Sequence, residues 1–193
     1  MLKVILVRPG ATTFDEQRRF KGSLDLPLSP LGEEQVRRLA EELKGEPIER
    51  VYVGPCTAAR QTAAALVAER NLPTTELADL RNVDHGLWHG RLIDEVRRQQ
   101  PRLYRLWQEM PEQFSPPGGE SWQEARQRAL RVVRRLCRSH RAGVVCIVVA
   151  EPLATLIQQQ LGDAVQVDVW KAECDCGGWQ LVQVVPELVG LTG

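Results

Sequence analysis

Hydrophobic and polar positions along the chain form runs typical of strands that alternate with runs typical of helices. Residues 2–7 and 144–149 are almost continuously apolar, which predicts strands buried on both faces of a parallel sheet. Shorter apolar runs predict further strands at residues 50–53, 74–77, 166–170 and 179–185. Together these segments predict one sheet that is largely parallel.

Apolar residues at helical spacing fill the intervals between these strands. Ser29 and Pro30 predict a helix start, because Ser caps helix N-termini and Pro suits the first helical position, and Gly45 predicts its end. Helices are expected at residues 30–44, from 57 to about 70, at 93–110 with a break near Pro101, at 121–140 and at 152–160. This order predicts an α/β fold, a three-layer α/β/α sandwich with a mostly parallel central sheet.

We expect a single domain over residues 1–193, with a helical insertion at about 91–120 and a loose tail at 187–193. In an open α/β sheet, ligands bind beyond the carboxyl ends of the strands. The segments that follow Val7, Val53 and Val149 are therefore the expected location of a site.

Composition narrows the class of protein. The chain has zero formal net charge, 43% hydrophobic and 26% charged residues, as globular proteins do. Its longest apolar run, 144–150, is too short to cross a bilayer, and residues 1–7 resemble a strand rather than a signal peptide. The five cysteines are scattered, unlike a disulfide framework. These features predict a cytoplasmic protein with reduced thiols, no cofactor and no membrane partner.

Charge is distributed unevenly along the chain. Residues 91–141 hold 12 Arg against six acidic residues. In the helix expected at 121–140, Arg128, Arg131, Arg135 and Arg138 fall on a different face from the apolar stripe. This face is either a solvated helix surface, which we favour, or a surface for an acidic partner. The basic residues are not interleaved with aromatic ones, so we do not expect nucleic acid as a partner.

Six segments carry motifs in a fixed order. They are LVRPGAT at 6–12, RFKG at 19–22, GPCTAARQTA at 54–63, LRNVDHGLWHG at 80–90, PGGES at 117–121 and VVAEP at 148–152. In this order and at these separations they resemble the histidine phosphatase superfamily, in its phosphoglycerate mutase-like branch. The resemblance covers nearly the whole chain and implies the fold of that family.

The resemblance also implies a chemistry. In the family, a His attacks the phosphoryl group, two Arg and a second His hold the phosphate oxygens, and an acidic side chain protonates the leaving group. Position by position, the chain keeps the first Arg as Arg8. The nucleophile falls on Pro9, the second Arg on Ala58, the acid on Asn82, the second His on Glu151, and a further Asn on Asp15.

From these replacements we expect a pseudoenzyme, a non-catalytic binding, regulatory or scaffold module, because two new carboxylates would repel a phosphate dianion. Its partner would be a protein, with a second copy of this chain as one candidate, or a small molecule. Two alternatives stay open: an enzyme with a rebuilt site in the same cleft, with or without a metal, and residual phosphatase or mutase activity. The expected binding residues are Arg8, Asp15, Glu151 and His85, and no metal ligand is assigned.

Each of these residues also has a structural interpretation. We favour pairing of Arg8 with Glu151 or Asp15, because an unpaired cation in a cleft is costly. His85 is either a rebuilt ligand or nucleophile, or an ordinary loop histidine, which we favour.

The cysteines are interpreted as structural. Cys174 and Cys176 form a C-x-C spacing that is neither a zinc nor a redox spacing. Cys56, Cys137 and Cys146 are expected to be small buried hydrophobic residues.

Overall fold

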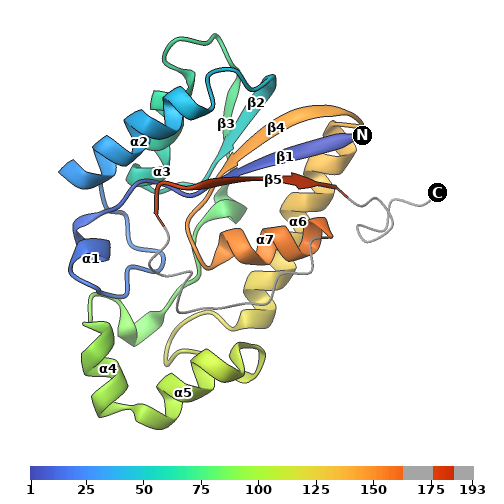
Figure 1. The fold of residues 1–193 in the computed structure, drawn as a ribbon. Coiled ribbons are helices and arrows are strands. Elements are labelled where there is room, and N and C mark those ends of the chain that lie inside the picture. The colour runs from blue at the N-terminus through green and yellow to red at the C-terminus, as the bar shows by residue number, and fades with distance from the viewer. Residues whose placement is uncertain (163–175, 185–193) are drawn as a thin grey trace.

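The computed structural model describes residues 1–162 and 176–184, and its centre is a five-stranded sheet. The strands are β1 (Leu2–Val7), β2 (Ile48–Val53), β3 (Thr74–Glu76), β4 (Gly143–Val148) and β5 (Trp179–Gln183). Their order is β3-β2-β4-β1-β5, and only β5 runs antiparallel to its neighbour (Figure 1). The mostly parallel sheet is therefore confirmed. The strand expected at 166–170 and the tail at 187–193 lie outside the described residues.

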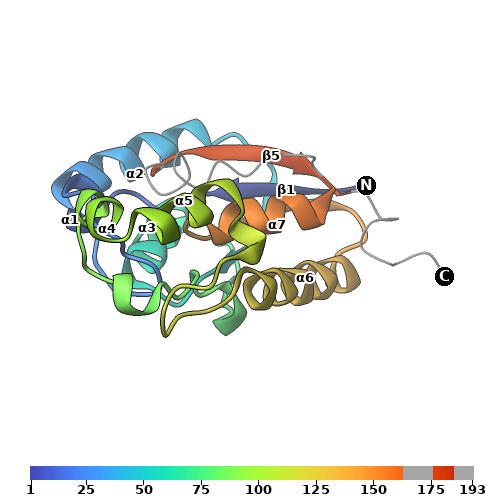
Figure 2. The ribbon, with the colours of Figure 1, turned by 90° about the horizontal axis from the view of Figure 1, so that it is seen from below.

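Helices cover both faces of the sheet (Figures 1 and 2). On one side lie α2 (Pro30–Glu42) and α3 (Thr57–Val67), and on the other α6 (Trp122–Ser139) and α7 (Leu153–Leu161). Alternate residues of β1 point to the two sides, as the strand pleat requires. Ile5 and Val7 pack in the core beneath α2 and α3, whereas Val4 and Leu6 pack in the core beneath α6 and α7. This arrangement is the expected three-layer sandwich.

The remaining helices lie below the carboxyl ends of the strands in Figure 1. They are α1 (Thr13–Glu16), η1 (Ala78–Leu80), η2 (Gly86–Trp88), α4 (Ile93–Gln99), α5 (Pro101–Glu109) and η3 (Pro111–Gln113). The break before Pro101 occurs as predicted. Aromatic rings join this region to the core: Trp88 stacks on Phe114 at 5.0 Å between ring centroids, and Phe20 meets Trp107 edge-on at 5.4 Å.

Local signals in the sequence account for some of the helix ends. The Ser29 hydroxyl accepts the Gly32 N–H at 3.2 Å, and Gly162 ends α7 with a φ of 109°, a left-handed conformation suited to glycine. The helix α3 starts at Thr57 as predicted, and its N-cap residue Cys56 makes no capping hydrogen bond with its side chain. The N–H of Thr57 instead donates to Asp25 from a distant segment, at 2.5 Å.

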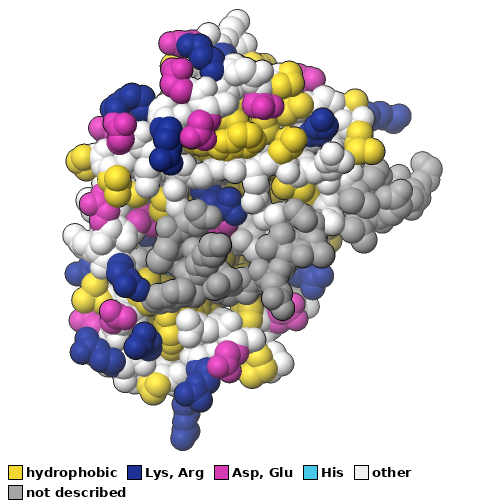
Figure 3. All heavy atoms as spheres, viewed as in Figure 1, with side chains coloured by type: hydrophobic (Ala, Val, Ile, Leu, Met, Phe, Trp, Pro, Cys, Tyr) yellow, Lys and Arg dark blue, Asp and Glu magenta, His cyan; other side chains and the backbone are white. Residues whose placement is uncertain are grey.

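The arginine face of α6 is partly as expected. Arg131, Arg135 and Arg138 are exposed. The prediction was wrong for Arg128, which is only 1% exposed because Glu120 neutralises it within the fold. On the face shown in Figure 3, Lys and Arg side chains lie next to Asp and Glu side chains. None of the described helices is both long and apolar enough to cross a membrane.

Candidate functional site

A pocket lies where the segments after β1, β2 and β4 meet. Hydrogen bonds hold these segments together: Gly54 N–H donates to Val148 at 3.0 Å, and Val149 N–H donates to Val7 at 3.0 Å. The pocket has a volume of about 470 Å³, counted with its open mouth. It is lined by Pro9, Gly10, Thr12, Lys21, Gly22, Ser23, Leu24, Leu26, Pro55, Cys56, Ala58, Arg81, Asn82 and Ala150. Its position is the one predicted from the sheet.

Arg8 and Glu151 form a buried ion pair beside this pocket. The Arg8 Nε lies 2.6 Å from Glu151 Oε1, and the two side chains are 11% and 2% exposed. The other carboxylate oxygen of Glu151 accepts two hydrogen bonds from Thr155, one from the backbone N–H at 3.0 Å and one from the side-chain hydroxyl at 2.8 Å. The expected pairing is confirmed for Glu151, and its carboxylate holds the start of α7 as well as Arg8.

Asp15 pairs with Lys21, so of the two expected partners of Arg8 it is Glu151 that forms the pair. Its Oδ1 lies 2.5 Å from Lys21 Nζ, and its Oδ2 accepts the N–H and the hydroxyl of Thr12, each at 2.7 Å. Burial alone would raise the pKa of Asp15, but the Lys21 charge and these hydrogen bonds outweigh it, so the pKa lies below its ordinary value. Asp15 is therefore ionised at neutral pH.

Asn82 lines the pocket, but its amide is committed to the protein backbone. Its Nδ2 donates to the carbonyls of Gly22 at 3.1 Å and Glu151 at 2.6 Å, and its Oδ1 accepts the Leu153 N–H at 3.4 Å. The side chain thus joins three segments around the pocket. It offers no carboxylic acid there.

Pro9 and Ala58 also line the pocket, and neither carries a side chain that can attack or bind phosphorus. Arg60, two residues beyond Ala58, is exposed and pairs with Asp25 at 3.3 Å. The positions that the resemblance marks for phosphate chemistry therefore line or border one pocket, although their residue types differ from the family motif.

His85 is placed apart from the pocket lining. It is 1% exposed and packs edge-on against Phe20 and Trp107, with ring centroids 5.5 and 6.2 Å away. Its neighbour His89 accepts the N–H groups of Ser23 and His85 at Nε2. The structure brings Arg8, Glu151 and Asp15 to the pocket region and leaves His85 in the aromatic core.

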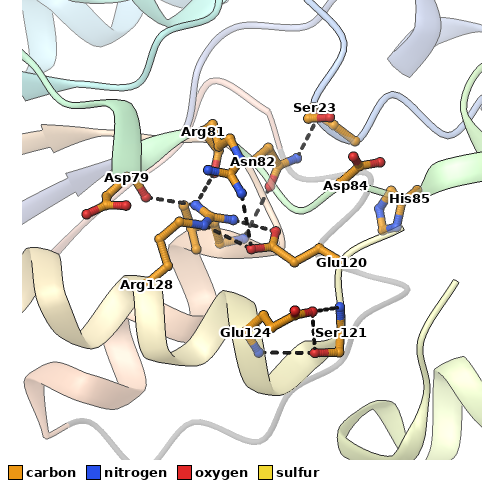
Figure 4. A network of polar contacts seen from close by, with 12 residues as sticks. Ser23, Asp79, Arg81, Asn82, Asp84, His85, Glu120, Ser121, Glu124 and Arg128 are labelled. Carbon is orange, nitrogen blue, oxygen red and sulfur yellow. Dashed lines mark hydrogen bonds and ion pairs between the residues drawn. The ribbon is translucent and has the colours of Figure 1, made fainter. Parts of the chain in front are cut away.

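Arg81 lies at the rim of the pocket and is held by a polar network (Figure 4). The two carboxylate oxygens of Glu120 accept hydrogen bonds from Arg128, at 3.0 Å from Nε and 2.6 Å from Nη2. Arg81 Nη2 lies 3.6 Å from Oε1 of the same carboxylate. Arg128 also donates to the carbonyls of Asp79 and Arg81. Two guanidinium groups therefore share one carboxylate, and Arg81 keeps a side chain that is 51% exposed.

Two residues of the pocket were missed by the sequence analysis, Lys21 and Arg81. Both belong to motifs quoted for the resemblance, but no family role was assigned to either position. The signal that could have found them is charge. The charged residues among those lining the pocket are these two, and both are cations.

The cysteines lie in different surroundings. Cys137 and Cys146 are buried as expected, and burial raises the pKa of Cys146 to about 12. Cys56 departs from the expectation, because it is partly exposed at the pocket wall. Cys176 Sγ lies 3.8 Å from Lys21 Nζ, and Cys174 lies outside the described residues. Within the described ranges, no three His, Cys, Asp or Glu side chains gather as metal ligands would.

Comparison with known proteins agrees with the fold. The sequence pattern of the histidine phosphatase superfamily (branch 1) matches residues 4–187. Phosphoserine phosphatase 1 of Hydrogenobacter thermophilus is 29% identical over 95% of this chain and 87% of its own. Adenosylcobalamin/alpha-ribazole phosphatase of Escherichia coli is 24% identical over 95% and 90%. The structure of Bacillus stearothermophilus YhfR superimposes with a TM-score of 0.83 at 24% identity, over 96% and 92%.

These relatives contradict the expectation of a non-catalytic module. Proteins that align with almost the whole chain are named as phosphatases, so the resemblance extends to active enzymes and not to a binding scaffold. The expectation rested on residue types alone, and a single sequence carries no measure of turnover. The finding favours the alternative, an enzyme that acts in the same cleft.

Proposed function

Since the chain belongs to branch 1 of the histidine phosphatase superfamily, we propose that it hydrolyses a phosphate monoester of a small molecule in this pocket. The observation that carries the proposal is the sign of the charged residues in the lining. Lys21 and Arg81 are cations, and no acidic side chain lines the pocket among the described residues. Each of the carboxylates of Asp15 and Glu151 is balanced by one cation, and Arg81 and Arg128 share the single carboxylate of Glu120, so a positive charge remains at the pocket to attract a phosphate group.

The two carboxylates support this binding because both are engaged behind the pocket wall. Glu151 is neutralised by Arg8, and Asp15 is neutralised by Lys21 and hydrogen-bonded to Thr12. In this proposal Asp15 is a positioning residue that fixes the Lys21 ammonium at the pocket. An ammonium group binds phosphate as a compact point charge.

The proposed attack comes from water, because the Pro9 ring amide has no lone pair to donate. The water oxygen forms a bond to phosphorus while the ester P–O bond breaks, and the electron pair leaves on the ester oxygen. The water protons stay on the released phosphate. In such loose transition states catalysis consists mainly of positioning and charge stabilisation, which Lys21 and Arg81 supply.

Hydrolysis by the purified protein tests the proposal. The substrates are p-nitrophenyl phosphate, phosphoserine and alpha-ribazole phosphate, the last two suggested by the names of the relatives. A charge-assisted contact is worth about 1.5–3 kcal/mol, so Lys21→Gln should lower kcat/KM about 10- to 100-fold.

Lys44→Gln is the matched control. Lys44 is 56% exposed, pairs with Glu69 and is not among the residues of the pocket, so this variant should keep the wild-type rate. Equal rates for Lys21→Gln and wild type would assign the hydrolysis to a contaminant and overturn the proposal. Absence of hydrolysis of all three esters would also overturn the proposal.

A further inference from the structure

Part of the pocket wall is apolar. Leu24, Leu26 and Pro55 line it, with Ala58 and Ala150 beside them. Leu24 is 36% exposed, although most large hydrophobic side chains of the chain are buried. An apolar group of a ligand that covers this wall gains the free energy of removing it from water.

Most of the hydrogen bonds that the neutral polar side chains of the pocket can donate already go to the protein. The three hydrogen bonds of the Asn82 amide go to the backbone, and the Thr12 hydroxyl donates to Asp15. Among the described lining side chains, the Ser23 hydroxyl and the Cys56 thiol are the remaining neutral donors. A leaving group rich in hydroxyls, such as a sugar, would lose its bonds to water without equal replacement.

Among the described residues, no carboxylic acid is placed to protonate the leaving oxygen. Residue 82 is an amide, Asp15 has a pKa below its ordinary value and is ionised, and Glu151 is held by Arg8. An alkoxide that leaves without a proton is about as basic as hydroxide, with a conjugate acid near pKa 15.7. A phenolate has a conjugate acid near pKa 10, as in tyrosine. Without a proton donor, a phenolate is therefore a better leaving group than an alkoxide, because the pKa values of their conjugate acids differ by between five and six units.

We infer that the pocket takes an aryl phosphate monoester, with the phosphoryl group at Lys21 and the aromatic ring against Leu24, Leu26 and Pro55. This inference rests on the proposed function for its chemical step. Water adds to phosphorus, the P–O(aryl) bond breaks, and the dianionic ester yields a phenolate and dihydrogen phosphate. Two independent observations support it, the apolar wall and the missing proton donor.

Binding and turnover test the inference separately. Calorimetry on the wild-type protein compares phenylphosphonate with methylphosphonate, neither of which can be hydrolysed to phosphate and alcohol. Phenylphosphonate should bind at least tenfold more tightly. Equal affinities would overturn the inference even if no ester is turned over.

Turnover is measured with phenyl phosphate, a ring-substituted series of phenyl phosphates, phosphoserine and a sugar phosphate. We expect kcat/KM to fall steeply as the pKa of the leaving phenol rises. Aryl esters should exceed the other two at least 100-fold. Rates for phosphoserine or the sugar phosphate equal to that of phenyl phosphate would refute the aryl preference and leave the proposed function intact.

Comparing two variants with the wild type on the same substrates cancels the intrinsic reactivity of aryl esters. Leu24→Ser should raise KM for phenyl phosphate about tenfold and lower the ratio of kcat/KM for phenyl phosphate to that for phosphoserine. Leu31→Ser is the matched control, because Leu31 is 50% exposed on α2 and does not line the pocket. Identical effects of both variants on all substrates would contradict the placement of the ring.

Discussion

Replacement of Glu151 by Gln removes one charge of the buried ion pair and keeps nearly the same side-chain shape. The amide oxygen of Gln can still accept from Thr155, as the carboxylate does at 3.0 and 2.8 Å. The Arg8 guanidinium, whose side chain is 11% exposed, then keeps its charge but loses the opposite charge of Glu151. The expected result is a large loss in the free energy of unfolding.

The magnitude follows from burial. Removing one partner of a buried pair costs about 3–5 kcal/mol, because a desolvated charge remains. For a chain of this size, that loss corresponds to a Tm lower by about 10 °C. Glu34→Gln is the matched control. Glu34 pairs with Arg37 on the surface of α2, where the side chains are 67% and 68% exposed, and this change should cost under about 1 kcal/mol.

Urea unfolding, followed by far-UV circular dichroism at pH 7, measures both changes. The double variant Arg8→Met/Glu151→Gln removes the cation as well and should recover at least half of the loss, because apolar replacement of a buried pair is often neutral. A loss below about 1 kcal/mol for Glu151→Gln would refute the reasoning. So would a double variant that is no more stable than the single one.

Three further outcomes are expected. Asp15→Asn should be less stable than wild type at pH 7, and its stability should fall less between pH 4 and pH 2. The reason is that the pKa of the Asp15 carboxylate lies below its ordinary 3.8, so its charge stabilises the fold at pH values above 3.8. This stabilisation is lost as pH falls through the lowered pKa. Urea unfolding at several pH values measures the difference. Cys146, with a pKa near 12, should react with iodoacetamide at pH 8 only after unfolding, as peptide mass spectrometry would show. Ser121→Ala should cost about 1 kcal/mol in urea unfolding, because the hydroxyl caps α6 by accepting the Glu124 N–H at 3.2 Å.

The layers of the fold could be predicted because each strand and helix carries its own signal. The apolar runs at β1 and β4 are long enough to require burial on both faces, and Ser29 and Gly162 mark helix ends by chemistry that acts within a few residues. The direction of β5 could not be predicted, because an edge strand has the same local pattern in either orientation.

The site was only partly predictable, because pairing depends on which side chains the fold brings together. Arg8 and Glu151 follow adjacent parallel strands, so topology alone brings them together. Asp15 and Lys21 come from a short helix and the loop after it, for which the sequence gives no geometry. A helical wheel placed Arg128 with its exposed neighbours, since periodicity cannot distinguish a solvated arginine from one neutralised by a buried carboxylate.

The position of β1 in the sheet has a consequence for how the chain comes to be folded. Leu2 is registered with Gly143, and Val7 with Trp179, so β1, the first of the described strands to be synthesised, has as its neighbours the last two of them. Until β4 and β5 have been synthesised, the segment LKVILV has neither of the strands that hydrogen-bond to it. Sheet closure is then a late, long-range event, and the nascent chain has to be shielded from aggregation through this apolar segment until β4 and β5 arrive.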